Sequence, residues 1–489
     1  MIDLSSVFHE KAFINGQWSD ADSGATFDVR NPATGEVIGH VPNMGAAETD
    51  RAIEAAEQAR VAWENKTGKE RAAILKRWAQ SIRDNLEPLA QLLTAEQGKP
   101  IAQARVDVSV GADYVDWFAE EAVRVAGETL AAHRSDLDVS VLKEPRGVTA
   151  AIEPWNFPAA MVTRGVAPAL AAGCPVVLKP SEDTPFTALA LAGLGEKAGI
   201  PPGVLNVVTG DRDAASTIGT ELTTHAAVRA VTFTGSTRVG KILMSQCVDT
   251  LKHPVMELGG NAPFIVFESA DVDKAVKGLL MSKFYNAGQA CISPNRIYVH
   301  ESRYDEFVQK FAEGTKTLKL GPGIDPTNDV GPLINELAVK KVEGLVNDAV
   351  AKGATIASGG ARREDGSLFF QPTVLTGITS DMAIAAEEIF GPVAAIQKFK
   401  DEAEVVCKAN NTPAGLAAYF YTNDMNQYFR VRGALKAGMV GVNEPYITGL
   451  AAPFHGIKES GTGTSLGHGI EEFLETKSVV VGGVQKLTL

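Results

Sequence analysis

The sequence predicts an α/β protein with two α/β domains and a small β extension, and three observations lead to this prediction. The chain has 489 residues, 45% of them hydrophobic, which is enough for roughly two to four structural units with large buried cores. From Val148 onward, short β-branched runs alternate with helical segments, the pattern of parallel strands joined by crossover helices. A second series of this kind begins near Phe264 and continues to about Thr464.

The predicted elements follow one another in a regular order. A short β run at residues 13–16 precedes long helical stretches at 49–63 and 69–93, which are rich in Ala, Glu and Arg. The helix at 185–198 has the clearest boundaries, because Thr184 can cap its start, Pro185 suits its first position and Gly199 can end it. Strands are expected at 148–152, 176–178, 205–208, 230–234 and 296–300.

Two apolar β runs, at residues 139–142 and 477–481, lie outside both α/β series. We expect them to form a β extension used in oligomer contact, which would give a homodimer or a homotetramer. The predicted boundaries place residues 1–125 and 148–257 in the first domain, 258–473 in the second, and 126–147 with 474–489 in the extension.

Composition and charge argue against several classes of protein. The formal net charge is −13 and no long Lys/Arg run is present, so a nucleic-acid partner is not expected. The N-terminus lacks a basic flank and an apolar core, and no apolar run reaches the ~18 residues of a membrane span, so we expect a soluble, cytoplasmic protein without a membrane partner. The cysteines lack CxxC spacing and the histidines lack ligand spacing, so neither disulfides nor a metal are expected.

Three motif matches are rejected on physical grounds. The segment 235–241 resembles a phosphate-binding P-loop, but Ile242 follows where that loop needs a Ser or Thr hydroxyl for magnesium. The segment 463–467 resembles a hydrolase nucleophile elbow around Ser465, but His468 is the only later histidine and no acid lies between the two. The glycines of 461–467 have the wrong spacing for a dinucleotide fingerprint and follow no predicted strand.

Three other residues form a candidate catalytic set. Cys291 lies in a glycine-bearing segment, Glu257 precedes two glycines that would let it swing, and Asn156 lies between prolines where the strand 148–152 ends. The carboxyl ends of parallel strands are where ligands bind. Taken singly, each residue has an ordinary interpretation: a cysteine buried as a small apolar residue, a glutamate in water at a strand end, and an asparagine in a turn.

Together with their surroundings, these residues resemble the aldehyde dehydrogenase superfamily, and the likeness runs nearly end to end. Cys291 and Glu257 are 34 positions apart, as in that family. The resemblance implies a Rossmann-like NAD-binding domain followed by an α/β catalytic domain. The matching segments are 154–158, 179–182, 233–237, 257–260, 288–291, 387–392 and 453–454.

The resemblance also implies a role for each candidate residue. Cys291 would form a thiohemiacetal with an aldehyde, Asn156 and the Cys291 backbone N–H would hold its oxyanion, and Glu257 would activate water to cleave the resulting thioester. Trp155, Gly235 and Ser236 would lie at the cofactor phosphates, Lys179 and Glu182 at the adenine ribose, and Glu388 and Phe390 at the nicotinamide end. Because the Glu182 carboxylate repels a 2′-phosphate, NAD is expected to be preferred, with NADP as the second option.

Within the superfamily, the chain resembles the succinate-semialdehyde dehydrogenases through segments 117–121, 159–164, 261–267 and 417–420. This resemblance implies that Arg164 binds the distal carboxylate of the aldehyde, with a surface salt bridge as its ordinary alternative. Three positions that this resemblance places at the substrate pocket depart from the group: Tyr285 replaces an arginine, Thr448 a serine and His455, expected at the pocket mouth, a glycine. These departures keep sulfolactaldehyde, glutarate semialdehyde and 2-oxoglutarate semialdehyde as alternative substrates.

Three other classes of protein remain as alternatives. A P-loop phosphohydrolase is opposed by Ile242, and a catalytically inactive relative is opposed by the intact set of Cys291, Glu257 and Asn156. A coenzyme A-acylating relative would resolve the thioester with a thiol, so the presence of Glu257 favours hydrolysis. The sequence therefore predicts an NAD(P)-dependent aldehyde oxidoreductase acting on a small anionic aldehyde.

Overall fold

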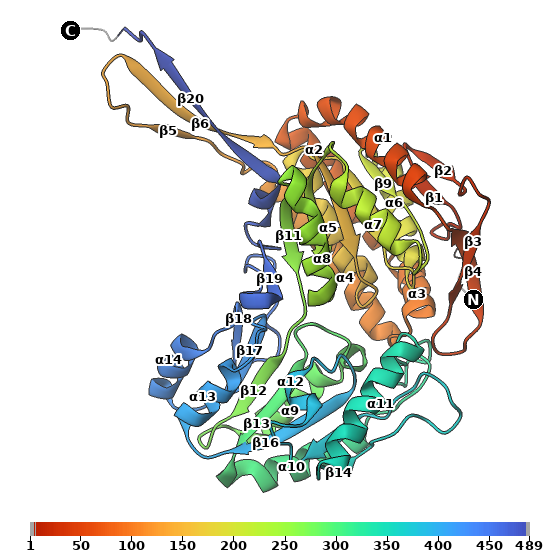
Figure 1. Ribbon diagram of the computed structural model, residues 1–489, viewed down its shortest axis with the longest axis vertical. Helices are drawn as coiled ribbons and strands as arrows, with labels where there is room; N and C mark the ends of the chain where they lie inside the picture. The colour runs from red at the N-terminus through yellow and green to blue at the C-terminus, as the bar shows by residue number, and fades with distance from the viewer. Residues whose placement is uncertain (1–3, 5, 486–489) are drawn as a thin grey trace.

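Figure 1 shows the computed structural model, which describes Leu4 and residues 6–485. Two sheets, each with helices on both faces, make up most of the molecule, and a narrow β extension projects away from the first of them. The predicted α/β class is confirmed. No helix among the described residues combines the length and the apolar character needed to cross a membrane.

The first sheet lies in the half of the molecule that contains the N-terminus (Figure 1). Its strands are β1 (Ala12–Ile14), β2 (Gln17–Ser19), β7 (Val148–Glu153), β8 (Val176–Pro180), β9 (Leu205–Val207), β10 (Val228–Thr234), β11 (His253–Glu257) and β19 (Gly461–Thr462). The order across the sheet is β19-β11-β10-β7-β8-β9-β1-β2. Strands β11, β10, β7, β8 and β9 run parallel, so their carboxyl ends meet at one edge of the sheet.

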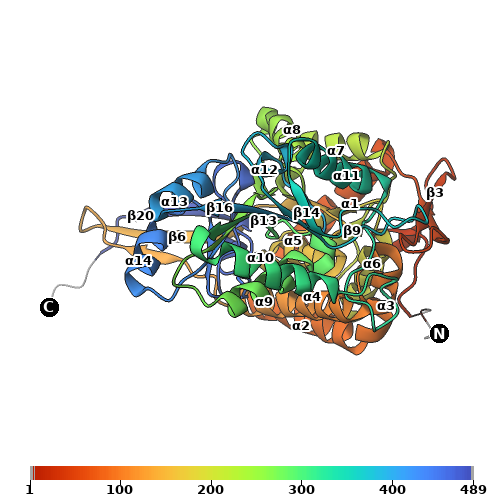
Figure 2. The ribbon, with the colours of Figure 1, turned by 90° about the horizontal axis from the view of Figure 1, so that it is seen from below.

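Helices cover both faces of this sheet, as the view in Figure 2 shows. One face carries α5 (Pro158–Ala172) and α6 (Pro185–Ala198), with α2 (Gly68–Asp84), α3 (Leu86–Gln97) and α4 (Ile101–Glu121) packed outside them. The other face carries α1 (Ala46–Glu64), α7 (Ala215–Thr224) and α8 (Thr237–Cys247). Trp78, Phe118 and Phe186 are fully buried in the core beneath the first group of helices, so that layer is held by a large apolar contact.

The single helix predicted at 69–93 is two helices in the structure. Helix α2 ends at Asp84 and α3 begins at Leu86, with Asn85 between them at φ −108° and ψ 23°. Pro88 explains the break, because it has no N–H to donate to the Asp84 carbonyl and its ring would clash with that carbonyl in a continuous helix. In the first turn of a new helix, a missing N–H donor leaves no intrahelical bond unmade.

The prediction that Thr184 caps the start of α6 is wrong. The helix begins at Pro185 and ends at Gly199 as predicted, but the Thr184 hydroxyl is buried without a hydrogen-bond partner. The Glu96 carboxylate takes the place of the cap, accepting from the N–H groups of Phe186 (2.8 Å) and Thr187 (2.9 Å). Glu96 lies 90 positions earlier in the chain, so no local pattern could indicate it.

The second sheet forms the other half of the molecule. Its strands are β12 (Ala262–Val266), β13 (Pro294–His300), β14 (Thr355–Ser358), β15 (Thr373–Thr376), β16 (Val393–Phe399), β17 (Ala417–Tyr421) and β18 (Met439–Val442), in the order β14-β15-β16-β13-β12-β17-β18. Apart from the antiparallel β14–β15 pair, neighbouring strands are parallel. The helices around it are α9 (Val272–Lys283), α10 (Glu301–Lys316), α11 (Glu336–Ala351), α12 (Ala383–Ala386), α13 (Glu402–Asn410) and α14 (Met425–Ala434).

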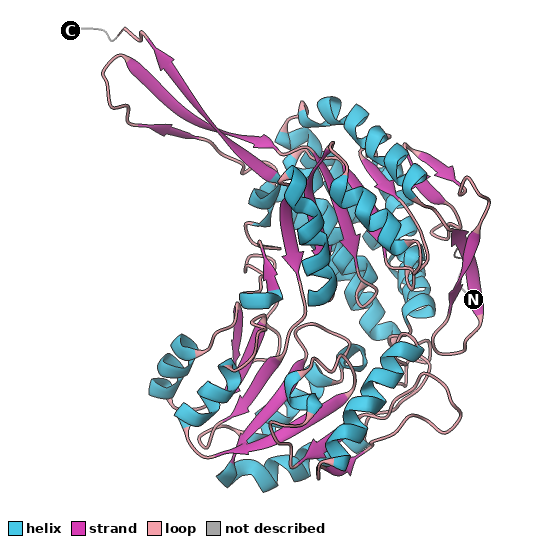
Figure 3. Cartoon of the chain, in the orientation of Figure 1, coloured by secondary structure: helices cyan, strands magenta, loops and turns pink. Residues whose placement is uncertain are grey.

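The extension consists of β5 (Glu128–Leu130), β6 (Leu137–Pro145) and β20 (Leu474–Gly482), drawn as magenta strands beyond the body in Figure 3. Strand β20 pairs antiparallel with β6 along its whole length, which places the predicted runs 139–142 and 477–481 side by side. Strands β3 (Thr26–Arg30) and β4 (Val37–Pro42) form a separate hairpin. The segment 258–473, predicted as the second domain, also contributes to the first sheet, because its strand β19 pairs with β11.

Candidate active site

A cavity of about 740 Å³ opens where β7, β8, β10 and β11 end. Its other walls come from the segments that follow α9, α12 and β18. The cavity brings together all the predicted site residues except His455. They are Trp155, Asn156, Arg164, Lys179, Glu182, Gly235, Ser236, Glu257, Tyr285, Cys291, Glu388, Phe390 and Thr448.

Cys291 lies in the loop between α9 and β13, and the backbone of that loop is unusual. Asn286 and Ala287 have φ values of 49° and 54°, a left-handed conformation that is rare for residues other than glycine and needs fixed surroundings. Burial raises the pKa of the Cys291 thiol to about 12, against the opposing effect of nearby Arg164. The thiol is therefore protonated at neutral pH.

Glu257 is the last residue of β11 and is buried, with 4% of its surface exposed. This placement excludes the interpretation of a glutamate in water. Its Oε1 accepts a hydrogen bond from Ser465 Oγ at 3.0 Å, and its Oε2 has no partner. Burial raises the pKa of Glu257 to about 7, partly offset by Arg164 and by the Ser465 hydrogen bond. A carboxyl with such a pKa can exchange a proton near neutral pH.

Asn156 follows β7 and is nearly buried, at the start of α5. Its Nδ2 donates to the backbone carbonyl of Gln289 at 3.2 Å, two positions before Cys291. Since the amide carries two N–H groups, this bond leaves one for another acceptor. The contact also ties the end of β7 directly to the cysteine loop.

The two glycines that follow Leu258 allow close packing of neighbouring segments, a role other than the one predicted. They were expected to let the glutamate swing, but both lie where other groups approach closely. A Cβ added at Gly260 would lie 2.2 Å from the Cys291 carbonyl oxygen, and one at Gly259 would lie 2.9 Å from Glu388 Oε2. The Gly260 N–H donates to Glu388 Oε1 at 3.0 Å. The glycines therefore allow the Glu257, Cys291 and Glu388 segments to pack together.

Arg164 lies on α5 with 3% of its surface exposed, which excludes the surface salt bridge. Its Nη2 donates to Thr234 Oγ1 at 3.3 Å, and its guanidinium lies 4.5 Å from the ring centroid of Phe454. Among the described residues, no carboxylate forms an ion pair with it within 4.0 Å. A buried guanidinium without an anion beside a cavity can bind the anionic group of a ligand.

The other predicted substrate residues divide into two groups. Tyr285 lines the cavity and stacks on Phe157, with ring centroids 6.1 Å apart, and Thr448 lines the cavity mouth from an exposed loop. His455 does not line the cavity, which corrects its predicted place. Its carbonyl and its Nε2 lie against Gly438 instead, because the neighbouring Phe454 turns its own ring toward Arg164.

The far end of the cavity contains the predicted nucleotide residues. Lys179 Nζ lies 3.3 Å from Glu182 Oε2 just after β8. Ser236 is the N-cap of α8 and accepts from the Val239 N–H at 3.3 Å, so the first N–H groups of this helix face the strand end. Trp155 and Phe390 meet edge to face, with centroids 5.5 Å apart. A helix N-terminus and a partly exposed carboxylate at the ends of parallel strands fit a dinucleotide such as NAD(P).

Several residues of the site were missed by sequence reasoning. Ser465, rejected as a nucleophile, contacts Glu257 from 208 positions away, and Thr234 contacts Arg164 from 70 positions away. No local pattern marks these pairs. Asp107 gives a detectable signal, because it is a charged residue at helical spacing from Ala104 and Gly111 on the buried face of α4.

One group of side chains away from the cavity has the residue types of a metal site. Within the described residues, Asp50, Glu221 and His225 have ligand atoms within 4.8 Å of one another. They lie outside the cavity lining, and an ion pair of 3.1 Å between His225 and Asp50 accounts for part of the cluster.

Two helix-covered sheets with a β extension, and a cysteine, a glutamate and an asparagine in one cavity, define an oxidoreductase of the aldehyde dehydrogenase class. Residues 18–479 match the model of the aldehyde dehydrogenase family, and the chain belongs to this family. It is an NAD(P)-dependent aldehyde dehydrogenase with that family's fold.

Two proteins of known activity and one crystal structure in this family are similar to the chain over nearly its whole length. The chain is 50% identical to the succinate-semialdehyde dehydrogenase (NADP(+)) GabD of Escherichia coli K12, over 98% of this chain and 99% of the relative. It is 52% identical to a 3-sulfolactaldehyde dehydrogenase of Pseudomonas putida, over 99% and 100%. The crystal structure of a succinate-semialdehyde dehydrogenase from Burkholderia pseudomallei is 53% identical, with a TM-score of 0.96 and coverage of 99% of both chains.

Proposed function

We propose that the protein oxidises a short aldehyde with a distal anionic group, of the succinate-semialdehyde kind, to the corresponding acid. The observation that carries this proposal is the convergence of Cys291, Glu257, Asn156 and a buried, unpaired Arg164 on one cavity. The decisive experiment is to measure NAD(P)H formation with short aldehydes that carry carboxylate, sulfonate or neutral tails. Preference for a neutral aldehyde of equal length would remove Arg164 from this role.

The residues of the cavity can divide the reaction between them. The Cys291 sulfur adds to the aldehyde carbon as the thiol proton leaves to solvent, and the former carbonyl oxygen becomes negatively charged. Asn156 Nδ2 and the Cys291 N–H donate to that oxygen and stabilise its negative charge as it develops. NAD(P)+, held by Lys179, Glu182 and Ser236, would supply the acceptor for the hydride whose loss leaves a thioester on Cys291. Glu257 then takes a proton from the water that attacks the thioester, and the acid leaves as the thiol is restored.

Glu182 supports a preference for NAD. Its partly exposed carboxylate beside Lys179 can accept from both hydroxyls of an adenine ribose, whereas a 2′-phosphate would meet a like charge. The E. coli relative is named for NADP(+), so the two cofactors must be compared directly. We expect a higher kcat/KM with NAD than with NADP, from initial rates at saturating aldehyde. An equal or higher value with NADP would overturn the preference.

Arg164 should determine the preference for an anionic aldehyde. Hydrogen bonds to charged groups contribute about 1.5–3 kcal/mol, so Arg164→Met should lower kcat/KM for succinate semialdehyde by about 10- to 100-fold. The value for butanal should fall less, because that aldehyde has no distal charge to bind and is affected only through the influence of Arg164 on the pKa of Glu257 and Cys291. Steady-state kinetics with both aldehydes test this, and an equal loss for both would show that Arg164 acts on the cavity as a whole.

A sulfonated lactaldehyde is the second candidate substrate. Tyr285 stands where the succinate-semialdehyde group has a second arginine, so the cavity holds one fewer cation but keeps a phenol hydroxyl. The similarity to a 3-sulfolactaldehyde dehydrogenase supports the same alternative. Glutarate and 2-oxoglutarate semialdehydes belong in the same substrate comparison.

Titration of Glu257 should set the acid side of the pH profile. Its pKa is raised to about 7 and only the carboxylate can act as a base, so kcat should rise as the pH increases through about 7. Ser465→Ala removes a donor to the charged form, which should raise this pKa further and move the rise to higher pH. Thr462→Val is the matched control, since this residue of β19 lies three positions before Ser465 and its hydroxyl donates to the Pro254 carbonyl instead. If kcat of Ser465→Ala rose at the same pH as kcat of the unmodified enzyme, Glu257 would not be the group that sets the profile.

The extension is our candidate for subunit contact in a homodimer or homotetramer. Leu130, Leu142, Val480 and Val481 expose between 43% and 58% of their surfaces there, and β5 and β20 have unpaired edges. Exposed apolar side chains and open edges favour association. A cytoplasmic location stays part of this proposal, because the four cysteines are scattered and lack CxxC spacing.

A further inference from the structure

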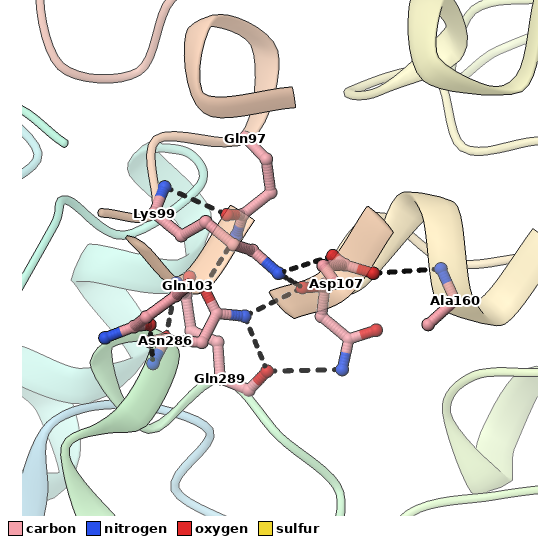
Figure 4. A network of polar contacts seen from close by, with 8 residues as sticks. Gln97, Lys99, Gln103, Asp107, Ala160, Asn286 and Gln289 are labelled. Atoms are coloured by element: carbon pink, nitrogen blue, oxygen red, sulfur yellow. Dashed lines mark hydrogen bonds and ion pairs between the residues drawn. The ribbon is translucent and has the colours of Figure 1, made fainter. Parts of the chain in front are cut away.

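A buried ion pair lies at the wall of the cavity that α4 forms outside α5, and one of its members, Asp107, is among the lining residues. Lys99 lies between α3 and α4, and Asp107 lies one to two turns into α4. Lys99 Nζ and Asp107 Oδ2 are 2.8 Å apart, and both side chains have no exposed surface (Figure 4). Removing two charges from water is unfavourable unless several hydrogen bonds compensate, so such a pair needs further partners.

Both members of the pair bind the segment that contains Asn156. Lys99 Nζ donates to the backbone carbonyl of Asn156 at 2.7 Å and lies 3.9 Å from the ring centroid of Phe157. Asp107 Oδ1 accepts from the Ala160 N–H at 2.9 Å, which satisfies a free donor in the first turn of α5. The ion pair thus fixes the chain from the Asn156 carbonyl to the first turn of α5.

The same carbonyl of Asn156 is bound from the cysteine loop. Asn286 Nδ2 donates to it at 2.8 Å and to the Gln289 carbonyl at 3.2 Å, and Gln97 Nε2 donates to Asn286 Oδ1 at 3.0 Å. Figure 4 shows these side chains converging from the α3–α4 connection and from the segment before Cys291. The position of the Asn156 amide relative to Cys291 is therefore determined by one buried polar network.

We propose that Lys99 and Asp107 are positioning residues that hold the Asn156 amide where the oxyanion of the adduct forms. This inference rests on the proposed function. Without the Lys99 ammonium, the Asn156 peptide loses one of its two donors and can rotate, which moves the amide away from the oxygen. An oxyanion donor is typically worth about 10²- to 10³-fold in rate, and a misplaced one loses part of that factor.

The test is a double-mutant cycle between Lys99→Met and Asn156→Ala in the full-length enzyme, with succinate semialdehyde and NAD+. We expect Lys99→Met alone to lower kcat by about 10- to 100-fold, with the KM for NAD+ unchanged. In the Asn156→Ala background the same change should lower kcat less than threefold, because the group it positions is gone. An equal loss in both backgrounds, or no loss in the single variant, would overturn the inference.

Further measurements separate this role from a general loss of structure. Alkylation of Cys291 by iodoacetamide develops no oxyanion, so its rate should stay within about threefold in Lys99→Met. Asp107→Asn, which keeps an acceptor for the Ala160 N–H, serves if Lys99→Met does not fold and should lower kcat in the same direction. Lys76→Met, at an exposed ion pair between α2 and α4, is the matched control. If Asn156→Ala itself retained full activity, the assignment of the oxyanion donor would be wrong instead.

Discussion

Replacing Cys291 with alanine should abolish aldehyde oxidation, with a loss in kcat/KM of at least about 10⁴-fold. The side chain is the nucleophile of the proposed reaction, and the other groups of the cavity act on an adduct that does not form without it. NAD+ should still bind with unchanged affinity, because Lys179, Glu182 and Ser236 line the other end of the cavity. NADH formation and calorimetric titration with NAD+ measure the two properties separately.

Cys407→Ala is the matched control for this experiment. Cys407 is exposed on α13, outside the cavity lining, so its removal should leave turnover unchanged. Turnover of Cys291→Ala within about tenfold of the unmodified enzyme corresponds to a loss of only about 1.4 kcal/mol and would refute the assignment. A loss of NAD+ binding in the same variant would show that the substitution disturbs the whole cavity.

Glu257→Gln should stop the reaction at the thioester. Glutamine keeps the size and the hydrogen-bond partner of the side chain but has no basic oxygen, so water is not activated and steady-state kcat should fall by about 10²- to 10⁴-fold. The first turnover does not require this base, so rapid mixing with aldehyde and NAD+ should give a burst of NADH close to one equivalent per active site. Stopped-flow absorbance measures the burst and the slow phase in one trace.

Glu268→Gln is the control, because Glu268 is an exposed glutamate just after β12 that does not line the cavity. It should show normal turnover and no separate burst beyond that of the unmodified enzyme. If Glu257→Gln lost the burst together with steady-state turnover, Glu257 would have to act before hydride transfer. Unchanged turnover would remove it from the mechanism.

Local patterns predicted those elements whose signals lie within a few positions of one another. Helix α6 has Pro185 at its start and Gly199 at its end, and the strands β7, β8 and β10 coincide with short β-branched runs. The single helix predicted at 69–93 overlooked a local signal, the break that Pro88 imposes, whereas two other failed predictions involve partners distant in sequence. Glu96 caps α6 from 90 positions away, and the ring of Phe454, with His455 turned aside, packs on Arg164 from another part of the chain.

The sequence by itself determined the class of fold, the family resemblance and the residues that bring chemistry to the cavity, because residue types and short spacings are written directly in the chain. Only the tertiary structure decided the state of those residues. Burial of Glu257 with a donor from Ser465, the partly exposed position of Cys291 on the cavity wall, and the attachment of Asn156 to Lys99 and Asn286 all depend on segments that meet in space. Desolvation and hydrogen bonding act at distances of a few ångströms, and chain folding sets those distances.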